Sequence, residues 1–202
     1  MLFGGQEEVG DQSAIAPEQS PNSMVAFGAA TGQALNDFSF DFYEDTIART
    51  SASDPIAMAK ASSPTEAAKA FLGHSESNPE QNRALAAFIK EATGTSIDPS
   101  KTAWCAAFID AVLRSNGSEG TGRLNARSYL NWGETVNEPK VGDVVVFSRG
   151  DPNGWQGHVG FYMGTNEDGT IKVLGGNQGN SVSEANYDAS KVLGYRRPPN
   201  LG

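Results

Sequence analysis

The pattern of apolar and polar positions divides the chain into an irregular first part, a helical middle and a β-rich last part. Over residues 79–94 and 104–117 the apolar side chains recur every three or four positions, which predicts two amphipathic helices. Both segments end in glycine, and the first begins with Pro79, since proline is tolerated at the first helical position. Shorter helices are predicted over 54–61, 65–73 and 124–133.

A different pattern begins after Pro139, where short runs rich in Val, Ile, Phe and Tyr are separated by turns of Gly, Asn and Asp. The four runs are 141–150, 157–166, 170–180 and 191–198. Such close spacing predicts antiparallel strands joined as a meander. Helices followed by a small antiparallel sheet make an α+β domain.

The charge is distributed unevenly and marks a domain boundary near residue 60. Residues 1–60 hold nine acidic and two basic side chains, and so contribute −7 of the net charge of −9. We therefore predict an acidic tail over 1–60 and one domain over 61–202. The tail is rich in small and polar residues, which indicates a linker, but its aromatic cluster at 38–43 (FSFDFY) also fits a segment that docks on a partner.

The composition excludes several classes of protein. With one cysteine and two histidines among 202 residues, the chain has no disulfide framework and no zinc finger, and neither a metal nor another cofactor is expected. An acidic chain without a cluster of Lys and Arg is not expected to bind nucleic acid. No run approaches the roughly 18 apolar residues of a membrane span. The first residues (MLFGGQEEVGDQ) lack the pattern of a signal peptide.

Cys105 is the first candidate for chemistry, because it stands at the start of a predicted helix, directly after Trp104. The free N–H groups and the dipole at a helix start favour a thiolate. A cysteine there is expected to have a lowered pKa and to act as a nucleophile. A lone cysteine among apolar neighbours also suits a core position, so its place in the sequence leaves both interpretations open.

His158 and Asn177 supply the partners that a nucleophilic cysteine needs. His158 begins a predicted strand after a glycine-rich turn, and Asn177 ends the next predicted strand. If these strands are antiparallel neighbours, the Asn177 carboxamide lies beside the imidazole and holds its tautomer and orientation. Gln178 is the alternative partner, but the next residue along a strand points to the opposite face. Cys105, His158 and Asn177 together are typical of thiol acyl transfer.

These segments resemble a known family. The sequences WCAAFIDAVLRSNG, LNARSYLNWG, PKVGDVVVFSRGDPNGWQGHVGFYMG, VLGGNQGN and LGYRRP are similar to the CHAP group of cysteine, histidine-dependent amidohydrolases/peptidases, in a subfamily common in bacteriophages and bacteria. The order of the elements also resembles the wider papain-like, NlpC-type superfamily. The resemblance covers about residues 65–199 and leaves the tail out. It implies a papain-like α+β fold and a peptidoglycan substrate.

The resemblance implies roles for individual residues. Cys105 matches the family's nucleophile, His158 its general base, and Asn177 the residue that orients the histidine. Many members have an acidic residue near that last position, where this chain has glycines. Residues expected to line or border the substrate groove are Trp104, Trp155, Trp132, Gln178 and Glu76, the last within a segment (LGHSESN) that resembles the helix-leading stretch of the subfamily. Trp155 and Trp132, as single aromatic side chains, equally suit packing positions.

The function expected from these residues is hydrolysis of peptidoglycan amide bonds, as an endopeptidase or an amidase, by a Cys-His-Asn thiol mechanism. Two rival functions stay open: a virion or secretion-machine component whose CHAP-like domain only binds the cell wall, and a papain-like acyltransferase. We expect the enzyme in a phage particle, held by phage tail proteins through residues 1–60, or free as a lysin that reaches the periplasm and cell wall without a signal peptide.

Residues 1–60 are expected to be dispensable for chemistry, because every candidate catalytic residue follows them. A truncated protein that starts at residue 61 should release soluble fragments from purified peptidoglycan at close to the rate of the full chain. Loss of that activity on truncation would show that the boundary near residue 60 is wrong. Mass spectrometry of purified phage particles tests the docking role, since absence of the chain there would leave a free lysin.

Overall fold

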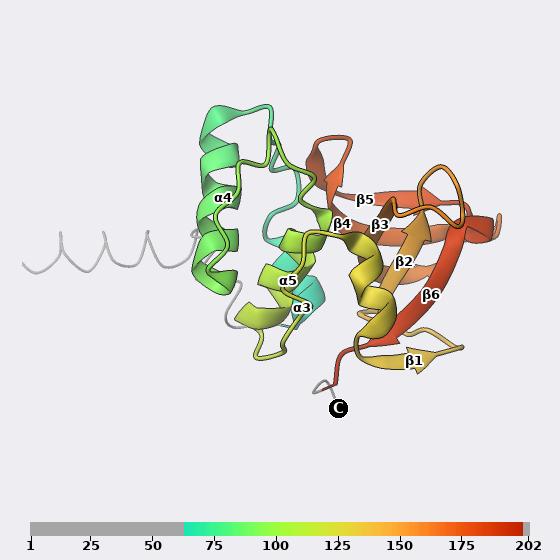
Figure 1. Cartoon of the computed structure of the whole chain (residues 1–202). Coiled ribbons are helices and arrows are strands. Elements are labelled where there is room, and N and C mark those ends of the chain that lie inside the picture. Colours follow the sequence, from blue (N-terminus) through green and yellow to red (C-terminus); the bar gives the residue numbers. More distant parts are fainter. Residues whose placement is uncertain (1–62, 200–202) are drawn as a thin grey trace, which may run out of the picture. The chain divides into compact units, whose positions relative to one another are not determined.

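The structure is a computed structural model that describes residues 63–199 (Figure 1). In this part of the chain three α-helices come first and six β-strands follow. The helices are α3 (Pro64–Lys69), α4 (Pro79–Thr93) and α5 (Cys105–Ser115), with the 3-10 helices η1 (Ala126–Asn131) and η2 (Ala189–Lys191). The strands are β1 (Glu134–Val136), β2 (Val144–Ser148), β3 (Gly157–Thr165), β4 (Ile171–Gln178), β5 (Ser181–Tyr187) and β6 (Val192–Arg197). The predicted α+β class is confirmed, while the acidic tail and the helix predicted over 54–61 lie outside the described residues.

Helix α4 shows how the local sequence sets the ends of an element. The Asn78 side chain accepts hydrogen bonds from the backbone N–H groups of Glu80 and Gln81. Pro79 occupies the first turn, where its missing N–H has no carbonyl partner to lose. Gly94 ends the helix with a φ of 74°, a left-handed conformation that glycine adopts without strain.

The six strands of the described chain form one antiparallel sheet in the order β1-β6-β2-β3-β4-β5. Strands β2, β3 and β4 form the predicted meander, and β5 continues it to one edge. The prediction is wrong for the last strand, because β6 crosses back and pairs with β2 and β1. An ion pair between β6 and the start of β2 stabilises this pairing: Nε and Nη2 of Arg197 donate to the buried carboxylate of Asp143 at 3.0 and 2.8 Å.

The core lies between α5 and the sheet. Helix α5 is buried over nine consecutive residues, from Cys105 to Leu113, and packs against β3 and β4. Helices α3 and α4 pack against α5, so the helices lie to one side of the sheet in Figure 1. The rings of Phe71, Phe88 and Phe108 join them, with centroids 4.4 to 6.3 Å apart. This packing gives the first residue of α5 a fixed place against the sheet.

Strand β4 carries a bulge where it passes the start of α5. Its register with β5 shifts between Gly175 and Gln178, and Asn177 has a φ of 57°. Gly176 lies so close to the ring of Trp104, the residue before α5, that a Cβ atom there would overlap the indole. Glycine at this position therefore allows Trp104 to lie directly on the sheet.

Gly176→Ala should lower the free energy of unfolding by about 1–3 kcal/mol, the usual cost of overpacking a core, because the added methyl group displaces Trp104. Gly175→Ala is the matched control, since a Cβ atom there has no neighbour nearer than 3.4 Å. Urea unfolding followed by tryptophan fluorescence measures both variants. Equal stability of the two would contradict the packing of Trp104 on β4.

Candidate active site

Cys105 is the first residue of α5 and lines a pocket of about 200 Å³. Only 4% of the residue is exposed. Trp104 occupies the capping position of the helix without accepting a hydrogen bond. The first backbone N–H groups of α5 are therefore not taken up by a capping side chain. The pocket is lined by Ala103, Cys105, Leu124, Asn125, Ala126, Arg149, Trp155, Gln156 and Gly157.

His158 stands on β3 and is fully buried. Its Nε2 atom lies 3.0 Å from Oε1 of Gln178 on β4. Its Nδ1 atom lies 3.3 Å from Nη2 of Arg149, which follows β2. Tyr187, the last residue of β5, stacks on the imidazole with ring centroids 5.1 Å apart and planes inclined by 14°. Gln178 and Arg149 thus each contact one ring nitrogen, and Tyr187 covers one face of the ring.

The hydrogen bonds of Gln178 determine which nitrogen of His158 carries the proton. The Gln178 amide nitrogen donates to the backbone carbonyl of Ser183, which can only accept. Oε1 therefore faces His158, and Nε2 of the imidazole must donate to it. The guanidinium of Arg149 can only donate, so Nδ1 is the unprotonated nitrogen. His158 is consequently a neutral imidazole with its lone pair on Nδ1, the form that a general base needs.

Gln178, and not Asn177, provides the carboxamide beside His158. The sequence prediction assumed regular alternation along β4, which would place Gln178 on the opposite face. The bulge between Gly175 and Gln178 breaks the alternation, because the left-handed backbone at Asn177 inserts an extra residue. The orienting position predicted for Asn177 is therefore wrong, whereas the pairing of β3 with β4 on which it relied is confirmed.

The thiol of Cys105 lies beside the same strand. Its sulfur accepts a hydrogen bond from the backbone N–H of Val159, the residue after His158. Burial raises the pKa of the thiol and outweighs the lowering by that N–H group, by the charge of Arg149 and by N–H groups at the start of α5. The lowered pKa expected from the helix start is therefore wrong for the free protein, because desolvation of the sulfur is the larger effect.

Burial also lowers the pKa of His158, to about 4, and the positive charge of Arg149 lowers it further. The hydrogen bond to Gln178 acts in the opposite direction but is the smallest of the three effects. At neutral pH the raised pKa of Cys105 and the lowered pKa of His158 therefore favour a thiol and a neutral imidazole rather than a thiolate and an imidazolium.

Trp104 and Glu76 form a structural contact. Nε1 of Trp104 donates to Oε2 of Glu76 at 2.5 Å, and the tryptophan is fully buried. Neither residue lines the Cys105 pocket. The groove position predicted for Trp104 is therefore wrong, because the ring is a core residue at the start of α5. Glu76 satisfies its indole N–H.

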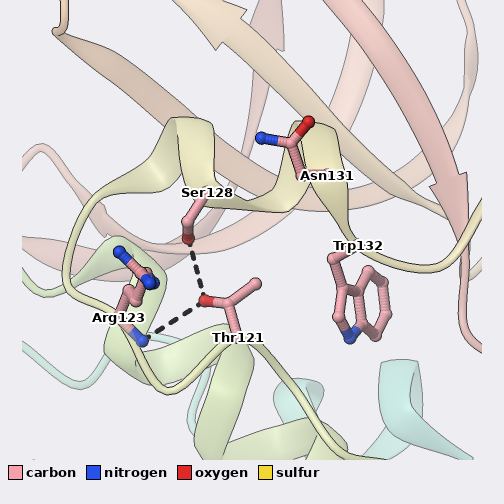
Figure 2. A pocket seen from close by; sticks show the side chains of 5 residues that line it. All are labelled: Thr121, Arg123, Ser128, Asn131 and Trp132. Carbon is pink, nitrogen blue, oxygen red and sulfur yellow. Dashed lines mark hydrogen bonds between the residues drawn. The ribbon is translucent and has the colours of Figure 1, made fainter.

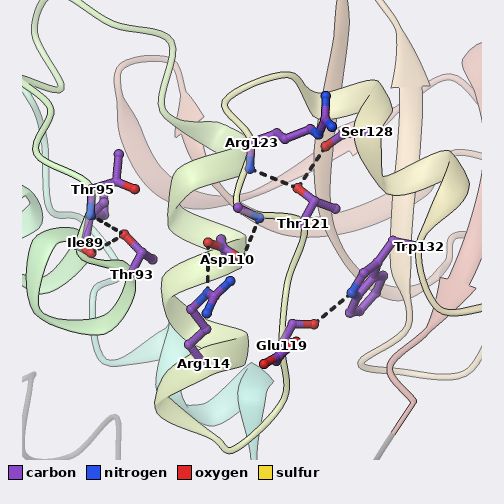
Figure 3. A network of polar contacts seen from close by, with 11 residues as sticks. Ile89, Thr93, Thr95, Asp110, Arg114, Glu119, Thr121, Arg123, Ser128 and Trp132 are labelled. Atoms are coloured by element: carbon purple, nitrogen blue, oxygen red, sulfur yellow. Dashed lines mark hydrogen bonds and ion pairs between the residues drawn. The ribbon is translucent and has the colours of Figure 1, made fainter.

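Trp155 and Trp132 lie at different pockets. Trp155 is 74% exposed and lines the Cys105 pocket, where a groove wall is expected. A second pocket, of about 410 Å³, is lined by Trp132 together with Thr121, Arg123, Ser128 and Asn131 (Figure 2). The Trp132 indole donates to the backbone carbonyl of Glu119 at 2.7 Å (Figure 3). The two pockets have no lining residue in common.

The loop after α5 contributes residues to both pockets and is hydrogen-bonded to the helix. Buried Asp110 pairs with Arg114 at 3.1 Å and accepts a hydrogen bond from the N–H of Gly122 (Figure 3). Farther along, the hydroxyls of Ser128 and Thr121 are 2.8 Å apart. These contacts hold the loop in place. Its next residues, Leu124, Asn125 and Ala126, line the Cys105 pocket.

Two residues of the site are absent from the sequence prediction. Arg149 comes directly after β2, at the end of a strand that pairs with the His158 strand, and that position is the signal that could have found it. Tyr187 belongs to β5, which the apolar pattern does not predict. Nothing in the sequence pointed to a ring that stacks on the histidine.

The described residues hold neither a candidate metal cluster nor a candidate membrane helix. Within residues 63–199 no group of three or more His, Cys, Asp and Glu side chains is placed to bind a metal ion. No helix in that range is both long and apolar enough to cross a membrane.

Part of the chain matches a known family. Residues 97–177 match the family described as the CHAP domain, which confirms the resemblance for this segment. A solved NlpC/P60 family protein from Bacillus cereus ATCC 10987 is 20% identical, with a TM-score of 0.43, and the match covers 66% of this chain and 38% of that one. The chain thus spans about two fifths of the length of that protein. No curated protein matches the sequence.

Stability should depend on pH through His158. Its pKa is about 4 in the folded chain against an ordinary 6.5, so between these values the unfolded chain binds a proton that the folded chain does not. The free energy of unfolding should therefore fall by about 3 kcal/mol as the pH falls from 6.5 to 4, and level off below. Urea unfolding across this range measures the change. His158→Gln should lack this part of the pH dependence, and a variant that keeps it would contradict a buried neutral histidine.

Proposed function

We propose that the chain is a peptidoglycan hydrolase that cleaves amide bonds of the cell-wall peptide with Cys105 as its nucleophile. The CHAP match includes Cys105 and His158, and that family implies amidase or peptidase activity. One observation carries the proposal: His158 is a buried neutral imidazole that Gln178 holds in one tautomer, with the Nδ1 lone pair on the side away from that contact. A thiol at a helix start beside such a base suits acyl transfer.

The first half of the reaction forms a thioester. Nδ1 of His158 takes the thiol proton as the Cys105 sulfur attacks the carbonyl carbon of the scissile amide. The carbonyl oxygen becomes an oxyanion, which backbone N–H groups at the start of α5 stabilise, including that of Cys105. The imidazolium then gives its proton to the amide nitrogen, the C–N bond breaks, and the amine leaves.

The second half releases the acid. Nδ1 takes a proton from water as the water oxygen attacks the thioester carbonyl, and the proton passes to the sulfur when the C–S bond breaks. Gln178 keeps its hydrogen bond to Nε2 throughout, so the ring stays in place while Nδ1 gains and loses a proton. The low pKa of His158 favours release of that proton to the leaving amine.

We further propose that the protein acts in a bacteriophage context, as a lysin or as part of the virion. The likeness of its motifs to the phage and bacterial subfamily supports this assignment. The acidic segment 1–60, with its aromatic cluster at 38–43, would dock on a tail protein when the enzyme is carried in the particle. As a free lysin, the same chain would reach the periplasm and cell wall after lysis begins.

Zymography on purified peptidoglycan tests the proposed reaction. The full chain should clear the substrate and release new amino groups, and Cys105→Ala should do neither, while still binding the polymer. Binding without release of amino groups would instead support a wall-binding structural protein. Faster transfer of the acyl group to an added amine than to water would support an acyltransferase.

Gln178→Ala should lower kcat roughly 100-fold, because the imidazole loses the acceptor that holds its tautomer. Asn177→Gly is the matched control, since glycine keeps the positive φ of 57° and removes only the carboxamide. It should leave kcat within about twofold of the unaltered chain. Steady-state kinetics on soluble peptidoglycan fragments compare the two. A larger loss in Asn177→Gly would return the orienting role to Asn177.

A further inference from the structure

Arg149 lines the same pocket as Cys105. It follows β2 and is exposed. Of the described residues that line this pocket, it is the one with a charged side chain. Within residues 63–199 the ion pairs join other groups, and no carboxylate pairs with this guanidinium. A positive charge without an acidic partner therefore stands at the mouth of the site.

The Arg149 guanidinium donates to Nδ1 of His158, the nitrogen that acts as the base in the proposed reaction. Nη2 of Arg149 donates to Nδ1 of His158 at 3.3 Å, longer than the usual 2.9–3.0 Å and therefore weak. Nδ1 has a single lone pair, and in the proposed mechanism that lone pair must accept the thiol proton of Cys105. In the proposed mechanism Arg149 and the thiol thus compete for one acceptor, and the contact with Arg149 makes Nδ1 a poorer base in the resting site.

We propose that Arg149 binds a carboxylate of the substrate beside Cys105, and that this contact draws the guanidinium away from Nδ1 of His158, so that binding of an acidic peptide frees the base. The inference rests on the proposed function and adds a substrate class to it. A guanidinium prefers a carboxylate to an imidazole nitrogen, because two parallel charge-assisted hydrogen bonds replace one weak one.

The size and lining of the pocket suit this ligand. Its volume of about 200 Å³ is below the roughly 300–1,000 Å³ of sites that enclose whole small molecules, so it takes one residue of a peptide. Trp155 and Leu124 are exposed apolar side chains on its wall, and Arg149 is the group that would bind an anion. A short peptide with a carboxylate next to the scissile bond fits both kinds of surface.

The effect of the Arg149 charge on the pKa of His158 also favours a carboxylate ligand. The charge of Arg149 lowers the pKa of His158, since it opposes a second positive charge on the ring. A bound carboxylate would neutralise the guanidinium and raise that pKa, which makes Nδ1 a stronger base for the thiol. The Gln178 amide and the Tyr187 phenol also contact the ring, and Cys105 is its partner in the proposed reaction. The pKa of both Tyr187 and Cys105 is raised, so none of these groups brings a charge at neutral pH.

Matched substrates test this role on the full chain. Soluble peptidoglycan fragments with free peptide carboxylates are compared with the same fragments after conversion of those groups to methylamides. The unaltered chain should favour the carboxylate form at least about tenfold in kcat/KM, as expected for a charge-assisted contact. Arg149→Met should lose the preference through a raised KM for the carboxylate form. The readout is the ratio of the two kcat/KM values within Arg149→Met, which should fall to about one, and not the absolute rate of the variant.

Two more variants separate this role from a structural one. Arg149→Lys keeps the charge and should keep part of the preference, while Arg123→Met, at an exposed arginine of the second pocket, should keep all of it. Equal rates of the unaltered chain on both substrates, or a preference that survives in Arg149→Met, would overturn the inference. A chain that cleaves neither substrate would instead overturn the proposed function.

A binding measurement tests the inference without turnover. In the full chain with ¹⁵N-labelled histidine, the Nδ1 resonance of His158 is followed at pH 7 while sodium acetate is added, with acetamide as the neutral control. Acetate should shift the resonance toward its position in Arg149→Met, acetamide should not, and the variant should respond to neither. An Nδ1 resonance that ignores acetate in the unaltered chain would show that the guanidinium stays in place, and would contradict the inference.

Discussion

The hydrogen bond from Nε2 of His158 to Oε1 of Gln178 is the contact on which the candidate site depends. It leaves the lone pair on Nδ1, and so decides which ring atom can act as a base. Gln178 is held by β5, through the carbonyl of Ser183, and is brought to the histidine by the bulge at Asn177. The edge strand β5, in which only Val182 is buried, thus holds the imidazole in two ways. Its Ser183 carbonyl positions Gln178, and its Tyr187 ring stacks on the histidine.

The same burial that fixes the site also sets its electrostatics. Helix α5 holds Cys105 against β3 because nearly all of the helix is in the core, and that environment raises the pKa of the thiol. His158 on β3 is also buried and is kept neutral, at a cost in stability below pH 6.5. Arg149 is the one nearby charge in the described chain that lowers both pKa values. The burial that fixes the positions of Cys105 and His158 therefore also keeps both side chains uncharged in the resting protein.

The sequence predicts those parts of the site in which regular periodicity and burial agree. Helices α4 and α5 and strands β2 to β4 follow from their apolar spacing, and with them the places of Cys105 and His158. Gln178 was named only as the alternative partner of His158, because its side depends on one left-handed residue that breaks the alternation of β4. β1 and β5 are edge strands with few buried positions, so they carry no clear apolar pattern. The burial of Trp104 also escaped prediction, since an apolar ring beside a cysteine suits a groove as well as a core.

The tautomer of His158 is the most direct test of this account. A long-range ¹H–¹⁵N correlation spectrum of the full chain with labelled histidine, recorded at pH 7, distinguishes a ring nitrogen that carries a proton from one that does not. His158 is assigned by its absence from the spectrum of His158→Gln. The account predicts a proton on Nε2 and none on Nδ1. A proton on Nδ1, alone or together with one on Nε2, would contradict it.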